Sequence, residues 1–373
     1  MNIKEKVLIY PFSKSSYSLL QALLLSDTYE VVKIVTPKAW LFSGNDIGSL
    51  ANRENFEILT EDNFEDALSS CTTVVIPEFP DRIFDKVFVN IKLALMQKKK
   101  VLYLSNKEIP NEESLKDLAI DKHTQFERIA YNVDWNYIIN RPKNNKEVLR
   151  NIDIPIIGIG ELIPTNQADE LAILLSAKFK ENGYRVKTVT NNIVLGKNTE
   201  YHQFPNLNEF DTDKQRVIAL NDFYHWLSLL EYPDLIITTV PNGLIQYNEQ
   251  FDNGFGILPF LLSLAIKIDY FILYSLYEKV ISNKYFDMLN NTFKYRYGFA
   301  IDNIVMSNIE LDFMSSREHN KFIFNYLPYL SVMEELKKHI KNSDITIPLY
   351  YFGDSNIVNN IYNQVIESLT NNN

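Results

Sequence analysis

The sequence is poor in the residues that most often mark a particular chemistry. It holds one cysteine, Cys71, so no disulfide can form within the chain and no cysteine–histidine cluster has zinc spacing. Only 11 of the 373 residues are glycine, and none precedes Gly44. The dinucleotide fingerprint G-x-G-x-x-G is therefore absent after the first predicted strand. No Ser–His–Asp or Cys–His arrangement can be argued, so we assign no catalytic residue and no metal ligand set.

Long apolar runs and excess positive charge are also missing. The densest apolar run, residues 257–266, has the length of a core helix and is too short to span a membrane. The apolar run near the N-terminus is too short for a signal peptide. We therefore expect a cytoplasmic protein with no membrane partner. A net charge of −10 argues against nucleic acid as a partner, because phosphates need a basic face.

Alternating strand and helix patterns predict two α/β domains. In the first third of the chain, apolar strand patterns at 6–10 and 30–35 alternate with helix patterns such as 16–25. Strands and helices at this spacing form a parallel sheet through right-handed crossovers. The polar stretch 140–155 resembles an interdomain connection. We predict a Rossmann-like domain with a parallel sheet over residues 1–148.

The second half restarts the alternation. A strand pattern at 154–160 leads into a helix pattern at 166–183, and a further strongly apolar strand is expected at 234–240. Gly183 stands where a glycine commonly ends a helix. We predict a second α/β domain over residues 149–373, similar to a P-loop NTPase with a degenerate phosphate loop.

The stretch PIIGIGELIPTNQADEL (155–171) has the strand–turn–helix outline of a phosphate-binding loop. The phosphate loop has the form G-x-x-x-x-G-K-[S/T]. Aligned on Gly158, this form keeps its hydroxyl at Thr165. Its second glycine and its lysine are replaced by Ile163 and Pro164.

Three interpretations of this loop remain open: an active phosphate site, an altered nucleotide or anion site, and an ordinary turn. The free N–H groups of a helix start near Thr165 and Asn166 favour an anion. The carboxylate of Glu161 would repel a phosphate. If the loop is active, its cofactor is a nucleotide with Mg²⁺, for which Asp234 and Glu161 are candidate ligands.

A second glycine-rich segment, TTVPNGLIQYNEQFDNGFGI (238–257), follows another apolar strand. Asn242 and the glycine after it form a turn signal. Ligands of open parallel sheets bind beyond the carboxyl ends of the strands. The two segments are therefore predicted to share one ligand crevice, unless the long loop simply needs glycine for its backbone. Together they hold five of the glycines: Gly158, Gly160, Gly243, Gly254 and Gly256.

Four further side chains are candidates for substrate or partner contacts. Lys14, among serines, can bind an anion or belong to a helix cap, and Trp40 can present a binding surface or fill an interface between domains. His202, in an expected loop, is a candidate acid or base, or a packing residue. Arg296, in FKYRYGF (293–299), can contact an anionic or aromatic ligand, or only favour a helix C-terminus.

Several blocks of the sequence together resemble the peptide maturation system proteins, found in clostridial gene clusters for ribosomally made, modified peptides. The blocks are scattered over most of both halves of the chain. They are YPFSKSSYSLL (10–20), VTPKAWLFSGNDIG (35–48), GIGELIPTNQADE (158–170), VPNGLIQYNEQFDNGFGILPF (240–260) and FKYRYGFAIDNIVMSN (293–308). Ala39, Asn45 and Gln167 depart from the family pattern, which has glycine at the first position and commonly lysine at the other two.

The resemblance implies a pathway and no reaction. Proteins of this family are associated with radical S-adenosylmethionine enzymes that modify peptides. We therefore expect an accessory protein that binds the precursor peptide, the radical S-adenosylmethionine enzyme, or both. Two alternatives stay open: an enzyme that uses a nucleotide, such as a ligase or phosphotransferase, and a structural interaction protein.

Overall fold

The computed structural model describes residues 3–130, 138, 148–195, 200–279, 282–342 and 346–371. The chain divides into two compact units. The first holds residues 1–132 and 192–201, and the second holds residues 133–191 and 202–373. Of the connection expected at 140–155, residues 140–147 lie outside the described residues.

The first unit is built on a six-stranded parallel sheet in the order β3-β2-β1-β4-β5-β6. This is the strand order of the Rossmann fold, so the predicted Rossmann-like parallel sheet is confirmed. The strands are β1 (Glu5–Ile9), β2 (Tyr29–Val35), β3 (Thr60–Glu61), β4 (Thr73–Ile76), β5 (Lys100–Leu104) and β6 (Phe126–Ile129). The helices are α1 (Tyr17–Leu24), α2 (Phe64–Leu68), α3 (Phe84–Met96) and α4 (Glu112–Asp121).

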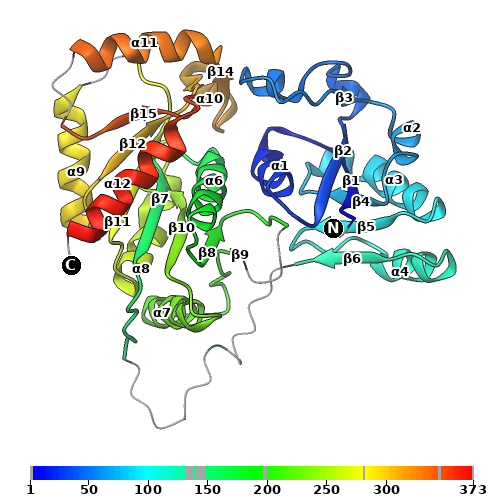
Figure 1. Ribbon diagram of the computed structural model, residues 1–373, viewed down its shortest axis with the longest axis horizontal. Helices are drawn as coiled ribbons and strands as arrows, with labels where there is room; N and C mark the ends of the chain where they lie inside the picture. Colours follow the sequence, from blue (N-terminus) through cyan, green and yellow to red (C-terminus); the bar gives the residue numbers. More distant parts are fainter. Residues whose placement is uncertain are drawn as a thin grey trace. The chain divides into compact units, whose positions relative to one another are not determined.

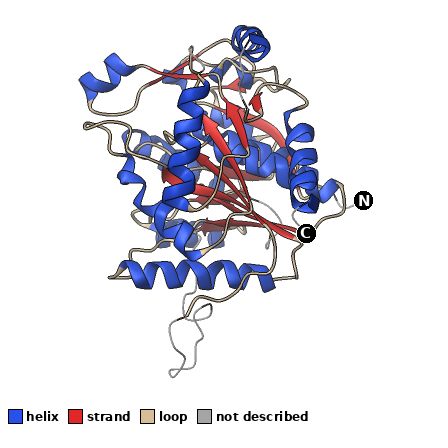
Figure 2. Ribbon diagram, turned by 90° about the vertical axis from the view of Figure 1, so that its left-hand side faces the viewer, coloured by secondary structure: helices blue, strands red, loops and turns tan. Residues whose placement is uncertain are grey.

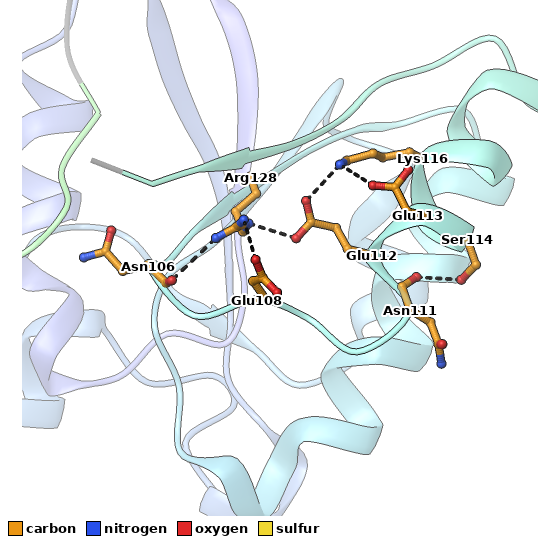
Figure 3. A network of polar contacts seen from close by, with 8 residues as sticks. All are labelled: Asn106, Glu108, Asn111, Glu112, Glu113, Ser114, Lys116 and Arg128. Atoms are coloured by element: carbon orange, nitrogen blue, oxygen red, sulfur yellow. Dashed lines mark hydrogen bonds and ion pairs between the residues drawn. The ribbon is translucent and has the colours of Figure 1, made fainter. Parts of the chain in front are cut away.

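Strand β6 was not among the elements predicted from the sequence. Its four residues include Glu127 and Arg128, and so short a charged run has no strand pattern. Ion pairs hold β6 beside α4: the Nε of Arg128 lies 2.8 Å from Glu112, which also pairs with Lys116 at 3.2 Å (Figure 3). Tertiary contacts therefore fix this edge strand where local propensity does not.

The second unit is built on a seven-stranded sheet in the order β15-β12-β11-β7-β10-β8-β9, with a separate β13–β14 hairpin. The described pairings among β15, β12, β11, β7, β10 and β8 are all parallel. The strands are β7 (Ile156–Glu161), β8 (Val186–Thr190), β9 (Tyr201–Gln203), β10 (Leu235–Gly243), β11 (Tyr270–Ser275), β12 (Asn303–Met306), β13 (Ile309–Leu311), β14 (Phe324–Tyr326) and β15 (Leu349–Tyr351). The helices are α6 (Gln167–Glu181), α7 (Asp213–Leu229), α8 (Ile257–Ala265), α9 (Asn283–Tyr297), α10 (Phe313–His319), α11 (Tyr329–Asn342) and α12 (Ile357–Asn371).

Helices cover both faces of the second sheet. Residues of α6 and α12 pack on one face, and residues of α7, α8, α9 and α11 pack on the other (Figure 1). The strands of this unit lie between these helical layers, as the view in Figure 2 also shows. Alternation along β7 follows from this arrangement: Ile157 and Ile159 face α6, while Gly158 and Gly160 face the other layer.

Helix α6 ends as the sequence predicts. Gly183 has φ of +88° directly after the C-cap residue. Its N–H donates to the carbonyl of Lys180, and the N–H of Tyr184 donates to the carbonyl of Phe179. These two bonds form a Schellman motif, and the rings of Phe179 and Tyr184 pack edge to face beside it.

No helix of the described chain is both long and apolar enough to cross a membrane.

Candidate functional site

The two glycine-rich segments leave the second sheet at the carboxyl ends of adjacent strands. Strand β10 pairs in parallel with β7, and Gly243 lies opposite Glu161. The side-chain amide of Asn253 joins the two loops, donating to the carbonyl of Leu162 at 3.0 Å and to that of Ile245 at 3.2 Å. The two segments therefore lie side by side at one edge of the sheet, as a shared ligand crevice requires.

The carboxylate of Glu161 occupies the start of α6. Its two oxygens accept the N–H groups of Thr165 (2.9 Å), Asn166 (3.1 Å), Gln167 (3.2 Å) and Ala168 (3.4 Å). The hydroxyl of Thr165 also donates to it. The free N–H groups of a helix start, which attract an anion, are thus bound by an anion of the chain itself.

Because of this geometry, the phosphate-loop pattern has to be aligned three residues later in the sequence. Gly158 and Gly160 lie inside β7, so the alignment on Gly158 is wrong. They are glycines because a Cβ on Gly160 would lie 2.9 Å from Phe271 Cζ, in the packed core. Aligned instead on the last residue of β7, Glu161 takes the place of the first glycine and Asn166 that of the second.

Asn166 supplies part of what the second glycine of such a loop supplies. Its φ of +66° is left-handed, and it is the N-cap of α6 without a side-chain cap bond. In place of a side-chain cap from Asn166, the carboxylate of Glu161 accepts the N–H groups of the helix start. Gln167 stands at the position of the lysine and Ala168 at that of the serine or threonine, so the realigned loop lacks both groups.

Burial controls the protonation of Glu161. Only 4% of the residue is exposed. Desolvation, together with the smaller effect of the Asp169 charge, raises the pKa of its carboxyl group from 4.5 to about 6, although the hydrogen bonds from Thr165 and Asn166 act to lower the pKa. The carboxylate is thus ionised at neutral pH and titrates in mildly acidic solution.

A buried cluster of polar side chains holds the start of α6 against the sheet. Asp169, on the first turns of α6, is fully buried and accepts the hydroxyl of Thr239 at 2.7 Å and the N–H of Asn191 at 2.9 Å. The amide oxygen of Gln167 accepts the hydroxyl of Tyr274 at 2.8 Å. These bonds tie α6 to the ends of β8, β10 and β11, which fixes the start of the helix.

The second segment is shaped by close approach of its backbone. Gly256 has φ of +64°, and a Cβ there would lie 2.2 Å from the carbonyl oxygen of Leu244. The hydroxyl of Tyr297 donates to that same oxygen. Asn242 and Gly243, predicted as a turn, instead end β10 after an irregularity in its register, so that prediction is wrong.

A cavity of about 420 Å³ opens at the same carboxyl edge. Residues from the ends of β7, β10 and β11, together with residues of α9 and β13, form its wall. The lining residues are Leu162, Ile163, Ile245, Gln246, Tyr247, Ser275, Leu276, Tyr277, Glu278, Lys279, Tyr285, Glu310 and Leu311. We call this cavity the edge pocket. Most of its lining residues follow the carboxyl ends of β7, β10 and β11, which is the position of ligand sites in open parallel sheets.

Acidic and phenolic groups dominate the polar part of the edge pocket. The Nζ of Lys279 lies 3.1 Å from the carboxylate of Glu310. Desolvation, and then the charge of Glu310, raise the pKa of Glu278. Desolvation and the charge of Glu278 raise the pKa of Tyr285 to about 12, so this phenol stays neutral.

The two proposed magnesium ligands are not placed for that role. Asp234 precedes β10, at the opposite edge of the sheet, and binds Arg185 through both oxygens, at 2.8 and 3.2 Å. The oxygens of Glu161 accept N–H and O–H donors instead. No group of three or more His, Cys, Asp and Glu side chains able to hold a metal ion occurs within the described ranges.

Lys14 and Trp40 lie in the first unit, each just beyond the carboxyl end of a strand. Those strands, β1 and β2, are neighbours. Lys14 is exposed, and desolvation lowers its pKa. Trp40 is half-buried in a 3₁₀ turn, and the exposed apolar side chain beside it is Leu41 (86%). Asp46 was not among the predicted site residues, yet its carboxylate accepts three N–H groups and organises the loop after β2.

His202 and Arg296 have structural surroundings. His202 was expected in a loop but lies in β9, half-buried, with its ring edge-on to Trp226 at 5.5 Å, so the loop prediction is wrong. Arg296 lies in the last turn of α9 and donates to the carbonyl of Phe255. It therefore supports the second glycine-rich segment as well as the helix C-terminus.

The geometry defines a class of protein: two α/β units, each with a large parallel sheet. No protein-family profile matches the sequence, and no curated protein matches it either. A DUF1611 family protein from Anabaena variabilis is similar in structure over 98% of this chain and 100% of its own, with a TM-score of 0.56 and 11% identity. At that identity the likeness shows the mixed α/β fold alone.

YvaA of Bacillus subtilis, a protein named as an oxidoreductase, matches 50% of this chain and 54% of its own. The TM-score is 0.27 at 16% identity, so this likeness carries no argument about fold or activity.

Proposed function

We propose that the protein is an accessory, peptide-binding protein in the maturation of a ribosomally made, modified peptide, and that its ligand site is the edge pocket. The observation that carries the proposal is the pairing of two features at one sheet edge. The anion position of the β7–α6 loop is filled by Glu161, and a pocket lined by tyrosine, glutamate and apolar side chains lies beside it.

The chemistry of this edge favours a peptide over a phosphate. A phosphate would have to displace the Glu161 carboxylate from four N–H groups and would face the carboxylates of Glu278 and Glu310. Aromatic and apolar walls with a few polar groups suit side chains of a peptide.

The sequence blocks that resemble the peptide maturation system proteins support the choice of pathway. They imply a radical S-adenosylmethionine enzyme as a second partner. Three of those blocks hold the two loops and the end of α9. The resemblance is therefore concentrated, in the second unit, on the segments that form and support the edge pocket.

The experiment compares two ligands by thermal unfolding of the full chain. The first is the precursor peptide encoded in the same gene cluster, and the second is ATP with Mg²⁺. We expect the peptide to raise Tm and ATP to leave it unchanged, since saturation at 100 times Kd adds ~2.7 kcal/mol of stability. A rise in Tm with ATP and none with the peptide would reverse the assignment.

One alternative has an observation in its favour. The strand–loop–helix order, together with the left-handed Asn166 at the position of the second glycine, is compatible with descent from a P-loop NTPase. On this alternative the protein is a nucleotide-dependent enzyme with a divergent site. ATP turnover that is lost in Thr165→Ala and retained in Thr292→Ala, a control on α9, would establish it.

A further inference from the structure

The edge pocket has an imbalance of charge. Glu278 and Glu310 bring two carboxylates to its wall, and Lys279 brings one ammonium group. That ammonium group lies against Glu310, at 3.1 Å. Glu278 is exposed, and no hydrogen bond or ion pair joins it to any residue that the structure describes. The pocket therefore presents one carboxylate whose charge is not compensated by a neighbour.

Three tyrosines line the pocket, and two of them lie within electrostatic reach of this carboxylate. Tyr277, Tyr285 and Tyr247 line the pocket, and the charge of Glu278 acts on the hydroxyls of Tyr285 and Tyr247. The hydroxyl of Tyr277 donates to Glu335, a carboxylate on α11, which adds negative charge on that side. Aromatic faces next to a carboxylate attract a cation through both the ring quadrupole and the charge.

We propose that the edge pocket binds the cationic side chain of a lysine or arginine residue of a peptide. The pocket volume of about 420 Å³ is in the usual range for ligand sites, and it suits one long side chain with its adjoining backbone. The apolar walls, which include Leu162, Ile163 and Leu276, contact the methylene chain, and Glu278 meets the charged end.

This inference deepens the proposed function and rests on it for the identity of the ligand as a peptide. The probes are blocked tripeptides, N-acetylated and C-amidated: Gly-Lys-Gly, Gly-Arg-Gly and Gly-norleucine-Gly. Norleucine keeps the length of the lysine chain and removes its charge. Ligand-observed NMR titration of the full chain should give a Kd at least ten-fold lower for the lysine or arginine tripeptide than for the norleucine one.

Two pocket variants and one control sharpen the test. Glu278→Gln should weaken binding of the cationic tripeptide at least five-fold, whereas Lys279→Gln should strengthen it, because it removes the competing cation. Glu367→Gln, on the exposed face of α12, should leave Kd unchanged. Binding should also weaken between 50 and 500 mM salt, as charge pairing near a surface does. Circular dichroism checks that the variants fold.

Equal Kd values for the lysine and norleucine tripeptides, or an unchanged Kd in Glu278→Gln, would overturn the inference. Its failure is distinct from failure of the proposed function. If the precursor peptide binds the native protein and Glu278→Gln equally, the function stands and the inference is wrong. If a cationic tripeptide binds but the precursor peptide does not, the pocket is a cation site and the proposed function is wrong.

Discussion

Two acidic side chains, one in each unit, organise the loop that follows a parallel strand. Asp46 accepts the N–H groups of Gly48, Phe56 and Ile58 in the first unit. Glu161 accepts the first N–H groups of α6 in the second. Sequence inspection interpreted Glu161 as a charge that repels phosphate. It missed that the same carboxylate can itself be the anion of the loop, because its partners are backbone groups that leave no trace in a sequence.

Glu161 should make stability depend on pH in a defined direction. Its folded-state pKa of about 6 lies above the ordinary 4.5, so the native state binds the proton more tightly than the unfolded chain does. The contribution of the Glu161 carboxyl group to the free energy of unfolding is therefore fully present below pH 4.5 and is lost as pH rises through 6. The difference corresponds to ~2 kcal/mol.

The measurement is urea unfolding of the native protein and of Glu161→Gln at pH 4 and at pH 7. Between these values the native protein should lose ~2 kcal/mol more unfolding free energy than the variant does, because glutamine does not titrate. Other carboxyl groups cancel in the comparison. Parallel pH profiles for the two proteins would show that the Glu161 carboxyl titrates normally.

At the scale of elements, the second glycine-rich segment provides a matched pair of substitutions. Gly254 and Gly256 both have positive φ, of +65° and +64°. A Cβ on Gly254 has only Asn242 Nδ2 nearby, at 3.7 Å, whereas one on Gly256 lies 2.2 Å from the carbonyl oxygen of Leu244. Gly254→Ala should therefore cost ~1–2 kcal/mol for the left-handed backbone. Gly256→Ala should cost a further ~1–3 kcal/mol for overpacking.

Chemical unfolding followed by circular dichroism measures both variants. The essential result is that Gly256→Ala lowers the free energy of unfolding more than Gly254→Ala does. If Gly254→Ala were as destabilising as Gly256→Ala, backbone conformation alone would explain both glycines, and the packing of the segment against Tyr297 would not matter.

The sequence predicted long apolar elements well and short polar ones poorly. The strand patterns at 6–10, 30–35 and 154–160 correspond to β1, β2 and β7, because buried parallel strands are continuous apolar runs. Strands β6, β9 and β14 have three or four residues and mixed polarity, so tertiary pairing decides them.

The candidate site was predicted in outline and not in its residues. The meeting of two strand-end segments follows from topology, which alternation of strands and helices reveals. The edge pocket was missed because Leu162, Tyr247 and Glu278 follow the separate strands β7, β10 and β11, and nothing in their spacing joins them. Gly158 lay in the strand predicted at 154–160 and was also aligned with the first glycine of a phosphate loop, since a glycine that admits a neighbouring ring looks the same in a sequence as one that turns the chain.

At the scale of the whole molecule, each unit has its own hydrophobic core. Cys71 is 3% exposed in the core of the first unit, and burial raises the pKa of its thiol. The cores of the second unit are formed by other residues. We expect the thiol to react with a disulfide reagent only when the first unit opens.

This gives a test of independent unfolding. Gly256→Ala weakens the second unit, and it should leave the rate of Cys71 modification in native buffer unchanged. Leu68→Ala, which removes a fully buried side chain of the core around Cys71, should accelerate modification by orders of magnitude. If Gly256→Ala accelerated Cys71 modification by the factor that its loss of unfolding free energy predicts, the two units would unfold together.

The position of Glu161 has a consequence for competition. Its carboxylate is tethered only four to seven residues from the N–H groups that it binds, so it acts on them at an effective concentration of at least about millimolar order. An external anion must exceed that concentration, and must also match the bonds, before it displaces the side chain. The fold therefore keeps the Glu161 carboxylate bound to this loop, and ordinary changes in the concentration of small anions do not displace it.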